Sequence, residues 1–297
     1  MEDVMRYVLE NETLKVEIDS FGAELKSVIN KETNQEYMWQ GDPAYWGRTS
    51  PVLFPFVGRL KNDSYLHEGK TYEMKQHGFA RDMEHQLVSK TETTILFKLV
   101  TSEETLKNYP FSFALSIGYE LSGNEVKVIW EVSNYSAEKH MHFSIGAHPA
   151  FNCPLHGEEN KAGYKFYFAG VDEIHHHGHT NTGLSVEEDI VLPLENNRAI
   201  ITPEFFDRCT YIIEGRQTNE VALEDPDGNR IVSVLFDMPL FALWSPEGKN
   251  APFVCIEPWC GRCDSVDFEG SLKKRAFDNS LEAGNKFSTS YTMRFGA

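Results

Sequence analysis

Three side chains with acid–base chemistry stand in apolar surroundings. Glu257 follows the apolar run 253–256 and precedes Pro258, a residue that favours extended backbone before it and so a strand end. Partial burial there would raise the pKa of a carboxyl group toward the range of a general base. His148 lies between Ala147 and Pro149, and His77 precedes a glycine. Each residue alone has an ordinary alternative, an exposed edge glutamate or a packed core histidine.

Two arginines are candidates for holding hydroxyl groups or an anion. The guanidinium groups of Arg59 and Arg81 offer fixed forks of donors, although a surface arginine is the simpler reading of either one alone. The formal net charge is −17, from 28 basic and 45 acidic residues, which disfavours nucleic acid and anionic membranes as partners. An anionic small molecule would need a local positive cluster, which Arg59, Lys61 and Arg81 could form.

Alternation of apolar and polar residues predicts many β-strands. It is clear at 14–18, 113–121, 126–132, 232–236 and 291–295. Turn signals separate these runs, and Asp225–Asn229 predicts a hairpin. Only 103–108 and 203–206 favour short helices, and the polar, histidine-rich stretch 170–185 suggests a long loop. We predict an all-β protein, a large antiparallel β-sandwich, folded as one domain over residues 1–297.

The cysteines and the amino terminus indicate a reduced, cytoplasmic protein. The cysteine count is odd, no secretory signal is visible, and no apolar run is long enough to span a bilayer. His175, His176, His177 and His179 could bind zinc, and so could Cys260 with Cys263, but neither has the complementary second pair of a structural zinc site. We therefore expect a solvated loop, ordinary thiols, and no metal or other cofactor.

Five motifs taken together are recognisable. The chain resembles the aldose 1-epimerase (galactose mutarotase-like) family over nearly its whole length, most of all the LacX-like branch, with the hexose-6-phosphate epimerases nearby. The motifs that carry the resemblance stand in family order at Pro55–Arg59, His77–Arg81, Ala147–Asn152, Phe206–Arg208 and Ile256–Trp259.

The resemblance implies a β-supersandwich with the sugar in a cleft on one sheet. It implies Glu257 as the catalytic base, His148 as the general acid and His77 as the second histidine. Arg59 and Asp207 would hold sugar hydroxyls, and Arg81 matches an arginine of the phosphate-sugar branch. Ala147 and Lys61-Asn62 depart from the galactose mutarotase pattern, so the hexose and its phosphorylation stay open.

These residue types suit mutarotation, the exchange of the α and β anomers of a sugar. Ring opening removes a proton from the C1 hydroxyl and delivers one to O5, and a carboxylate with an imidazolium can do both. The predicted function is therefore that of an aldose 1-epimerase acting on a hexose or hexose phosphate.

Two other functions are compatible with parts of the sequence. A glycoside hydrolase could use Asp207 and Glu257 as its carboxyl pair, but it leaves the histidine motifs unexplained. A sugar-binding protein without activity could share the scaffold. The sequence does not reveal the oligomeric state.

Overall fold

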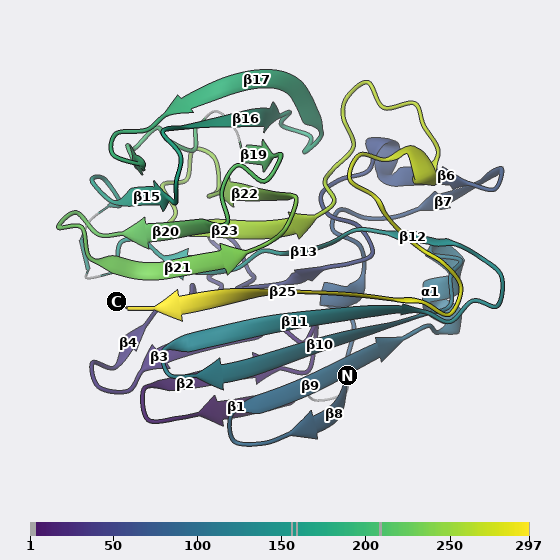
Figure 1. Cartoon of the computed structure of the whole chain (residues 1–297), viewed down its shortest axis with the longest axis horizontal. Coiled ribbons are helices and arrows are strands. Elements are labelled where there is room, and N and C mark those ends of the chain that lie inside the picture. Colours follow the sequence, from purple (N-terminus) through teal and green to yellow (C-terminus); the bar gives the residue numbers. More distant parts are fainter. Residues whose placement is uncertain (1–3, 156, 159, 208–209, 297) are drawn as a thin grey trace.

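Many strands bury every second side chain. In β2 (Leu14–Asp19), Leu14, Val16 and Ile18 are fully buried and the residues between them are partly exposed. The computed structural model describes residues 4–155, 157–158, 160–207 and 210–296. Nearly all of its regular elements are antiparallel strands arranged in packed sheets, which confirms the predicted all-β sandwich class (Figure 1). Cys209 and Arg208 lie outside the described residues.

Three sheets form the body of the molecule. The nine-stranded sheet has the order β18-β15-β20-β21-β25-β11-β10-β9-β8. Its strands are β8 (Gln86–Lys90), β9 (Thr94–Val100), β10 (Phe113–Ser122), β11 (Glu125–Asn134), β15 (Lys165–Phe168), β18 (Arg198–Ile200), β20 (Glu220–Glu224), β21 (Arg230–Phe236) and β25 (Lys286–Phe295).

The eight-stranded sheet has the order β17-β16-β19-β22-β23-β13-β5, with β14 also paired to β23. Its strands are β5 (Val52–Leu53), β13 (Ile145–Ala147), β14 (Ala150–Asn152), β16 (Glu173–His179), β17 (Ser185–Pro193), β19 (Tyr211–Glu214), β22 (Leu240–Trp244) and β23 (Phe253–Cys260).

The four-stranded sheet and the remaining elements complete the fold. The sheet runs in chain order through β1 (Arg6–Glu10), β2 (Leu14–Asp19), β3 (Leu25–Asn30) and β4 (Gln35–Glu36). Two further pairs are β6 (Ser64–His67) with β7 (Lys70–Glu73) and β12 (Met141–Phe143) with β24 (Asn279–Leu281). The helices are α1 (Glu103–Asn108) and the 3₁₀ turns η1 (Lys61–Asp63), η2 (Ala80–Asp82) and η3 (Leu272–Lys274).

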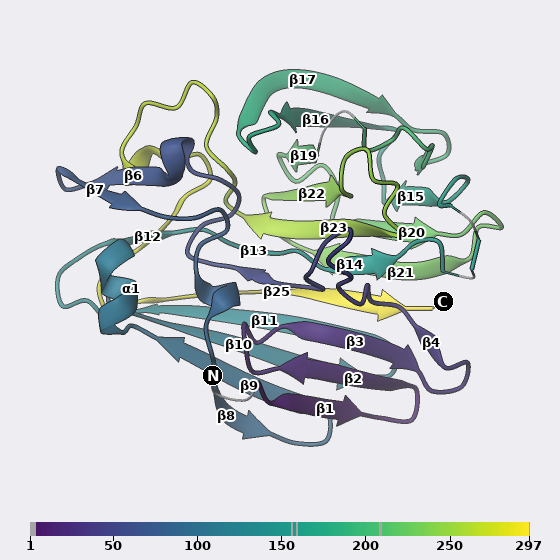
Figure 2. The ribbon, with the colours of Figure 1, turned by 180° about the vertical axis from the view of Figure 1, so that it is seen from behind.

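The nine-stranded sheet is the layer that the other two share. The four-stranded sheet covers the part formed by β9–β11, and the eight-stranded sheet covers the part near β20 and β21 (Figures 1 and 2). Ring contacts join both pairs of layers: Tyr7 of β1 lies 5.6 Å from Phe97 of β9, and Phe236 of β21 lies 5.2 Å from Phe241 of β22.

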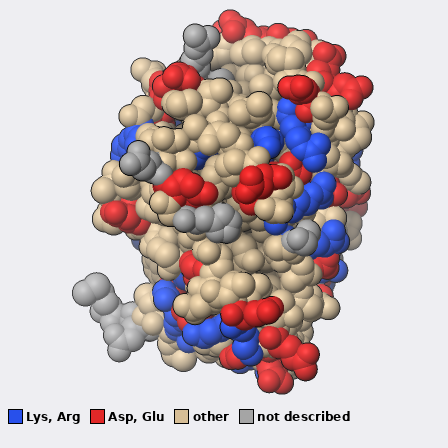
Figure 3. All heavy atoms as spheres, turned by 90° about the vertical axis from the view of Figure 1, so that its left-hand side faces the viewer, with Lys and Arg blue, Asp and Glu red and all other residues tan. Residues whose placement is uncertain are grey.

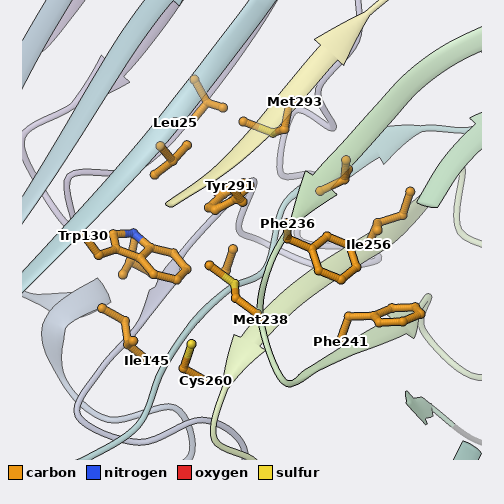
Figure 4. Close-up of a cluster of buried hydrophobic side chains, with 14 of the residues drawn as sticks. Leu25, Trp130, Ile145, Phe236, Met238, Phe241, Ile256, Cys260, Tyr291 and Met293 are labelled. Carbon is orange, nitrogen blue, oxygen red and sulfur yellow. The ribbon is translucent and has the colours of Figure 1, made fainter. Parts of the chain in front are cut away.

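One continuous apolar core fills the space between the layers. Leu25 of β3, Tyr291 of β25 and Ile256 of β23 all belong to it (Figure 4). The side chain of Ile256 points from β23 into this core. Successive residues of a strand point to opposite faces, so the side chain of the next residue, Glu257, points to the other face of the sheet.

The structure contains one of the two predicted short helices and the predicted hairpin. The helix at Glu103–Asn108 is confirmed and begins with a reciprocal cap between Ser102 and Thr105. The hairpin at Asp225–Asn229 is confirmed as the connection of β20 to β21. The short helix favoured at 203–206 is wrong, because those residues form turns. No helix among the described residues is long and apolar enough to cross a membrane.

The predicted loop 170–185 is also wrong, because it contains strand β16, Glu173–His179. Its alternation was hidden because histidines occupy both faces: Ile174 and His176 are buried on one side, while His175, His177 and His179 lie on the other. The register with β17 also shifts between His176 and Gly178, which interrupts the regular strand pattern.

A buried ion pair fastens the segment that follows β23. The guanidinium of Arg275 lies 2.7 Å from Asp264, with both side chains no more than 3% exposed, and Asp264 also accepts from the backbone N–H of Lys61. Asp264 therefore connects the region after β23 to the segment that carries Gly58 and Arg59, since its own N–H donates to the Arg59 carbonyl.

We expect Asp264→Asn to lower the free energy of unfolding by about 3–5 kcal/mol, because it leaves a buried guanidinium without its counter-charge. Urea denaturation measures the change. The matched control is Asp237→Asn, which breaks the exposed ion pair with Arg216 and should cost less than about 1 kcal/mol. Equal, small losses in both variants would contradict the role of Asp264.

Candidate active site

Glu257 and His148 lie close together because two short strands, β13 and β14, pair with the same side of β23, one after the other. β13 pairs with its end, Gly146 opposite Trp259, and β14 pairs with its beginning, Ala150 opposite Cys255. The chain breaks from the sheet between these two short strands, at His148 and Pro149, opposite Glu257. The motifs Ala147–Asn152 and Ile256–Trp259 are therefore the two sides of one interruption in the sheet.

The interruption places an acid–base pair in a buried position. His148 Nε2 lies 3.4 Å from Glu257 Oε2, and the two residues are 7% and 1% exposed. Within the part of the chain that the structure describes, Glu257 Oε2 and His148 Nδ1 have no hydrogen-bond partner. The carboxylate oxygen is thus left for a proton that comes from a bound molecule or from His148.

His77 joins the pair through an unusual backbone conformation. His77 has φ 67° and Gly78 has φ 70°, and a Cβ at Gly78 would lie 2.3 Å from the carbonyl oxygen of Phe54. The His77 N–H donates to the Gly58 carbonyl, and the Gly58 N–H donates back to His77 Nδ1 at 3.0 Å. Because Nδ1 accepts, a neutral His77 carries its hydrogen on Nε2 and is a donor there.

Aromatic rings hold the His148 imidazole. Trp46 stacks on it with ring centroids 4.6 Å apart, Trp244 meets it edge-on at 5.1 Å, and His77 lies 5.7 Å away. These rings also exclude water from the pair, which strengthens electrostatic interactions inside the site.

Burial determines the charge states. It raises the pKa of Glu257 well above its ordinary value and lowers the pKa of His148 to about 3, with the nearby Arg81 as a second cause for the histidine. Burial, followed by Arg81, lowers the pKa of His77 well below 6.5. Each group is therefore pushed toward its neutral form, and in that form the pair carries one proton, on Glu257.

The pair and His77 open onto one cavity of about 300 Å³. Its volume is at the lower end of ordinary small-ligand sites. The lining residues are Trp46, Arg48, Gly58, Gln76, His77, Arg81, His148, His179, Gly183, Thr210, Ile212, Trp244, Glu257, Trp259 and Cys263.

Four of the six site residues expected from the sequence line this cavity: Glu257, His148, His77 and Arg81. Arg59 and Asp207 do not. The Arg59 guanidinium lies 3.0 Å from Asp63 and donates to the Thr182 carbonyl, while Asp207 is exposed. Roles for these two in substrate binding stay predictions.

The basic residues that line the cavity differ from the expected cluster of Arg59, Lys61 and Arg81. Arg81 is accompanied by Arg48, both bound to the carboxylate of Asp82, and Lys61 instead pairs with Glu269. Burial and the neighbouring Arg48 lower the pKa of Arg81 to about 10. Arg48 stands in no motif, so only its place in the fold identifies it.

The cysteines and the histidine tract form no cluster of metal ligands with each other among the described residues. Cys153, Cys255, Cys260 and Cys263 are buried free thiols. Among the described residues, the one group of potential metal ligands that lie within 4.8 Å of each other is His148, Cys255 and Glu257, and none of the tract histidines belongs to it.

Comparison with known proteins places this fold in a family. The model of the aldose 1-epimerase family matches residues 5–294. The chain is 33% identical to the LacX protein, chromosomal form, of Lactococcus lactis subsp. lactis over 276 residues, which cover 90% of this chain and 91% of that protein.

Two solved structures are similar over their whole length. A galactose mutarotase related enzyme from Lactobacillus acidophilus has a TM-score of 0.93 and 35% identity, covering 99% of this chain and 98% of its own. A galactose mutarotase-like protein from Lactobacillus casei has a TM-score of 0.90 and 30% identity, covering 98% and 99%. The chain belongs to the aldose 1-epimerase family, in its LacX-like branch, and this supports a mutarotase, and so an isomerase, as its general function.

The raised pKa of Glu257 predicts a pH-dependent effect of Glu257→Gln on stability. The folded protein resists ionising this carboxyl, so wild type loses stability from this group as the pH rises from the unfolded pKa of about 4.3 toward the higher folded pKa. Glutamine does not titrate. The variant should therefore gain stability over wild type as the pH rises from 4 to 8.

Thermal or urea unfolding at several pH values measures this difference. Glu247→Gln, at an exposed glutamate, removes the same charge without the burial and is the control. A constant difference between Glu257→Gln and wild type across the pH range would show that burial does not perturb this carboxyl.

Proposed function

We propose that this protein catalyses the interconversion of the α and β anomers of a hexose or hexose phosphate, with Glu257 as base and His148 as acid. The observation that carries the proposal is the buried Glu257–His148 pair, 3.4 Å apart, with His77 beside it in a sugar-sized cavity. This arrangement has a proton acceptor, a proton donor and an additional N–H donor in one water-poor site.

Ring opening uses the single proton of the pair. The proton that Glu257 carries at rest first moves to His148 Nε2, 3.4 Å away. The resulting Glu257 carboxylate takes the proton of the C1 hydroxyl while the His148 imidazolium gives its proton to O5, and the C1–O5 bond breaks. The pair ends as carboxylic acid and neutral imidazole, which are the forms that burial favours. Rotation about C1–C2 and the reverse transfers close the ring on the other face.

His77 would assist ring opening as a hydrogen-bond donor. Its Nδ1 accepts from Gly58, so its Nε2–H is the donor available to the ring oxygen as negative charge develops there. Its lowered pKa keeps the ring neutral, so this donation adds no second positive charge next to His148.

Glu257→Gln and His148→Asn should each reduce catalysed anomer exchange about 10²–10⁴-fold, because each removes one positioned proton transfer. Exchange-spectroscopy NMR on D-galactose, D-glucose and glucose 6-phosphate measures the rates. His142→Asn is the matched control, since that histidine pairs with Asp278 and does not line the cavity. Near-normal exchange by Glu257→Gln would refute the assignment of the base.

Arg48 and Arg81 support a phosphorylated substrate. Acidic and basic side chains are interspersed on the face of the molecule in Figure 3, so an anion needs a local cluster of cations. Both residues line the cavity, and among the described residues the ion pairs of both arginines go to one carboxylate, that of Asp82. Guanidinium forks suit phosphate oxygens.

We expect Arg48→Gln to raise the KM for glucose 6-phosphate about tenfold or more and to change the KM for glucose by less than about twofold, since a charge-assisted contact contributes ~1.5–3 kcal/mol. Lys61→Gln is the control, because its amine pairs with Glu269 away from the cavity. Equal effects of Arg48→Gln on both sugars would argue for a free hexose as the substrate.

A further inference from the structure

His179 is the one member of the histidine tract that lines the catalytic cavity. It is the last residue of β16, and it stands where the chain turns toward β17. No family motif contains it, and the proposed proton transfers do not use it.

Strand register places His179 on the same face as Glu257. His177 pairs with Ile212, Ile212 with Ala242, and Ala242 with Glu257, so these four side chains form one row across β16, β19, β22 and β23. Directly paired residues share a face, and His179 is two residues beyond His177 on the same side. Three strand spacings of ~4.8 Å separate the two backbones by roughly 14 Å, which leaves room for a sugar ring between the side chains.

His179 makes a close hydrogen bond with a second cavity residue. Its Nε2 contacts the hydroxyl of Thr210, whose side chain also lines the cavity. His179 Nδ1 is buried and lacks a partner among the residues that the structure describes. His179 and Thr210 are called the polar wall below.

The polar wall keeps unused hydrogen-bonding capacity in either tautomer of a neutral His179. If the Thr210 hydroxyl donates to Nε2, the ring hydrogen is on Nδ1 and has no acceptor. If Nε2–H donates to Thr210, the hydroxyl hydrogen is free. A sugar hydroxyl, which both donates and accepts, satisfies either state.

The polar wall lies among cavity residues of mainly apolar character. Ile212 and Trp244 offer mainly apolar surface, and Asp207, which the sequence suggested for hydroxyl binding, is exposed and outside the cavity. We propose that His179, held by Thr210, binds a sugar hydroxyl remote from C1 and so determines which hexose is preferred. This inference rests on the proposed mutarotase function.

If His179 and Thr210 determine sugar preference, their loss should change KM and leave kcat nearly unchanged. His179→Phe keeps a planar ring and removes the hydrogen bonds, and Thr210→Val keeps the shape and removes the hydroxyl. Each should raise the KM for the preferred hexose about 3- to 10-fold, the worth of one hydrogen bond, with kcat changed less than about twofold. Among D-glucose, D-galactose and D-mannose, the ratio of kcat/KM between the best and the next sugar should fall by the same factor.

Three further variants give the test its controls. His179→Gln retains a donor and an acceptor and should recover part of the lost preference. His175→Gln changes a histidine on the same face of the same strand, whose ring pairs with Asp189 outside the cavity, and should leave every rate unchanged. Glu257→Gln should lose exchange on all three sugars alike.

Sugar binding is also measured without turnover, by titrating the same three hexoses against the fluorescence of Trp46 and Trp244, which line the cavity. Weaker binding in His179→Phe and Thr210→Val, with folding confirmed by circular dichroism, supports the polar wall even if wild type exchanges no anomers. Active wild type with unchanged KM, Kd and sugar preference in both variants would overturn the inference and leave the proposed function intact. If His179→Phe fails to fold, Thr210→Val decides alone.

Discussion

The site depends on the interruption in the strand next to β23. A continuous partner would place a regular residue pair opposite Glu257, but β13 ends at Ala147 and β14 begins at Ala150, and the two residues between them include His148. The interruption holds the imidazole 3.4 Å from a carboxyl that is 1% exposed. The sheet thus provides a rigid frame for a polar pair that water cannot easily reach.

That frame has an energetic consequence. Burial opposes the charged forms of both Glu257 and His148, so the resting pair favours its uncharged arrangement, and the ion-pair arrangement lies above it in free energy. Proton transfers with a bound sugar convert one arrangement into the other without a change in net charge. A site of this kind is used for reactivity at a cost in stability, as is common for catalytic groups.

Much of the fold could be predicted from the sequence because period-two alternation marks half-buried strands directly. The expected sandwich, the short helix at 103–108 and the hairpin at 225–229 were all recognisable. β16 was missed because histidine counts as polar in such patterns, yet His176 is 4% exposed and packs on Tyr211. Burial of a polar residue is decided by its neighbours across the sheet, and a sequence window does not contain them.

Site residues, too, could be predicted only where neighbours in the sequence mark them. Glu257, His148, His77 and Arg81 could be identified because each lies in a motif whose neighbours constrain the backbone, such as Gly78 beside the Phe54 carbonyl. Arg48, Trp46, His179 and Thr210 reach the same cavity from segments with no local signal. Only the register of β16, β19, β22 and β23 brings His179 and Glu257 to one face.

The proton of the pair can be observed directly by NMR. Carboxyl ¹³C shifts of Glu257, assigned by their loss in Glu257→Gln, and ring ¹⁵N shifts of His148 report the two protonation states across pH 4 to 9. We expect that at pH 7 Glu257 is still a carboxylic acid and His148 a neutral imidazole. A Glu257 signal that titrates near pH 4.3, the value of an exposed glutamate, would show that burial does not keep this carboxyl protonated.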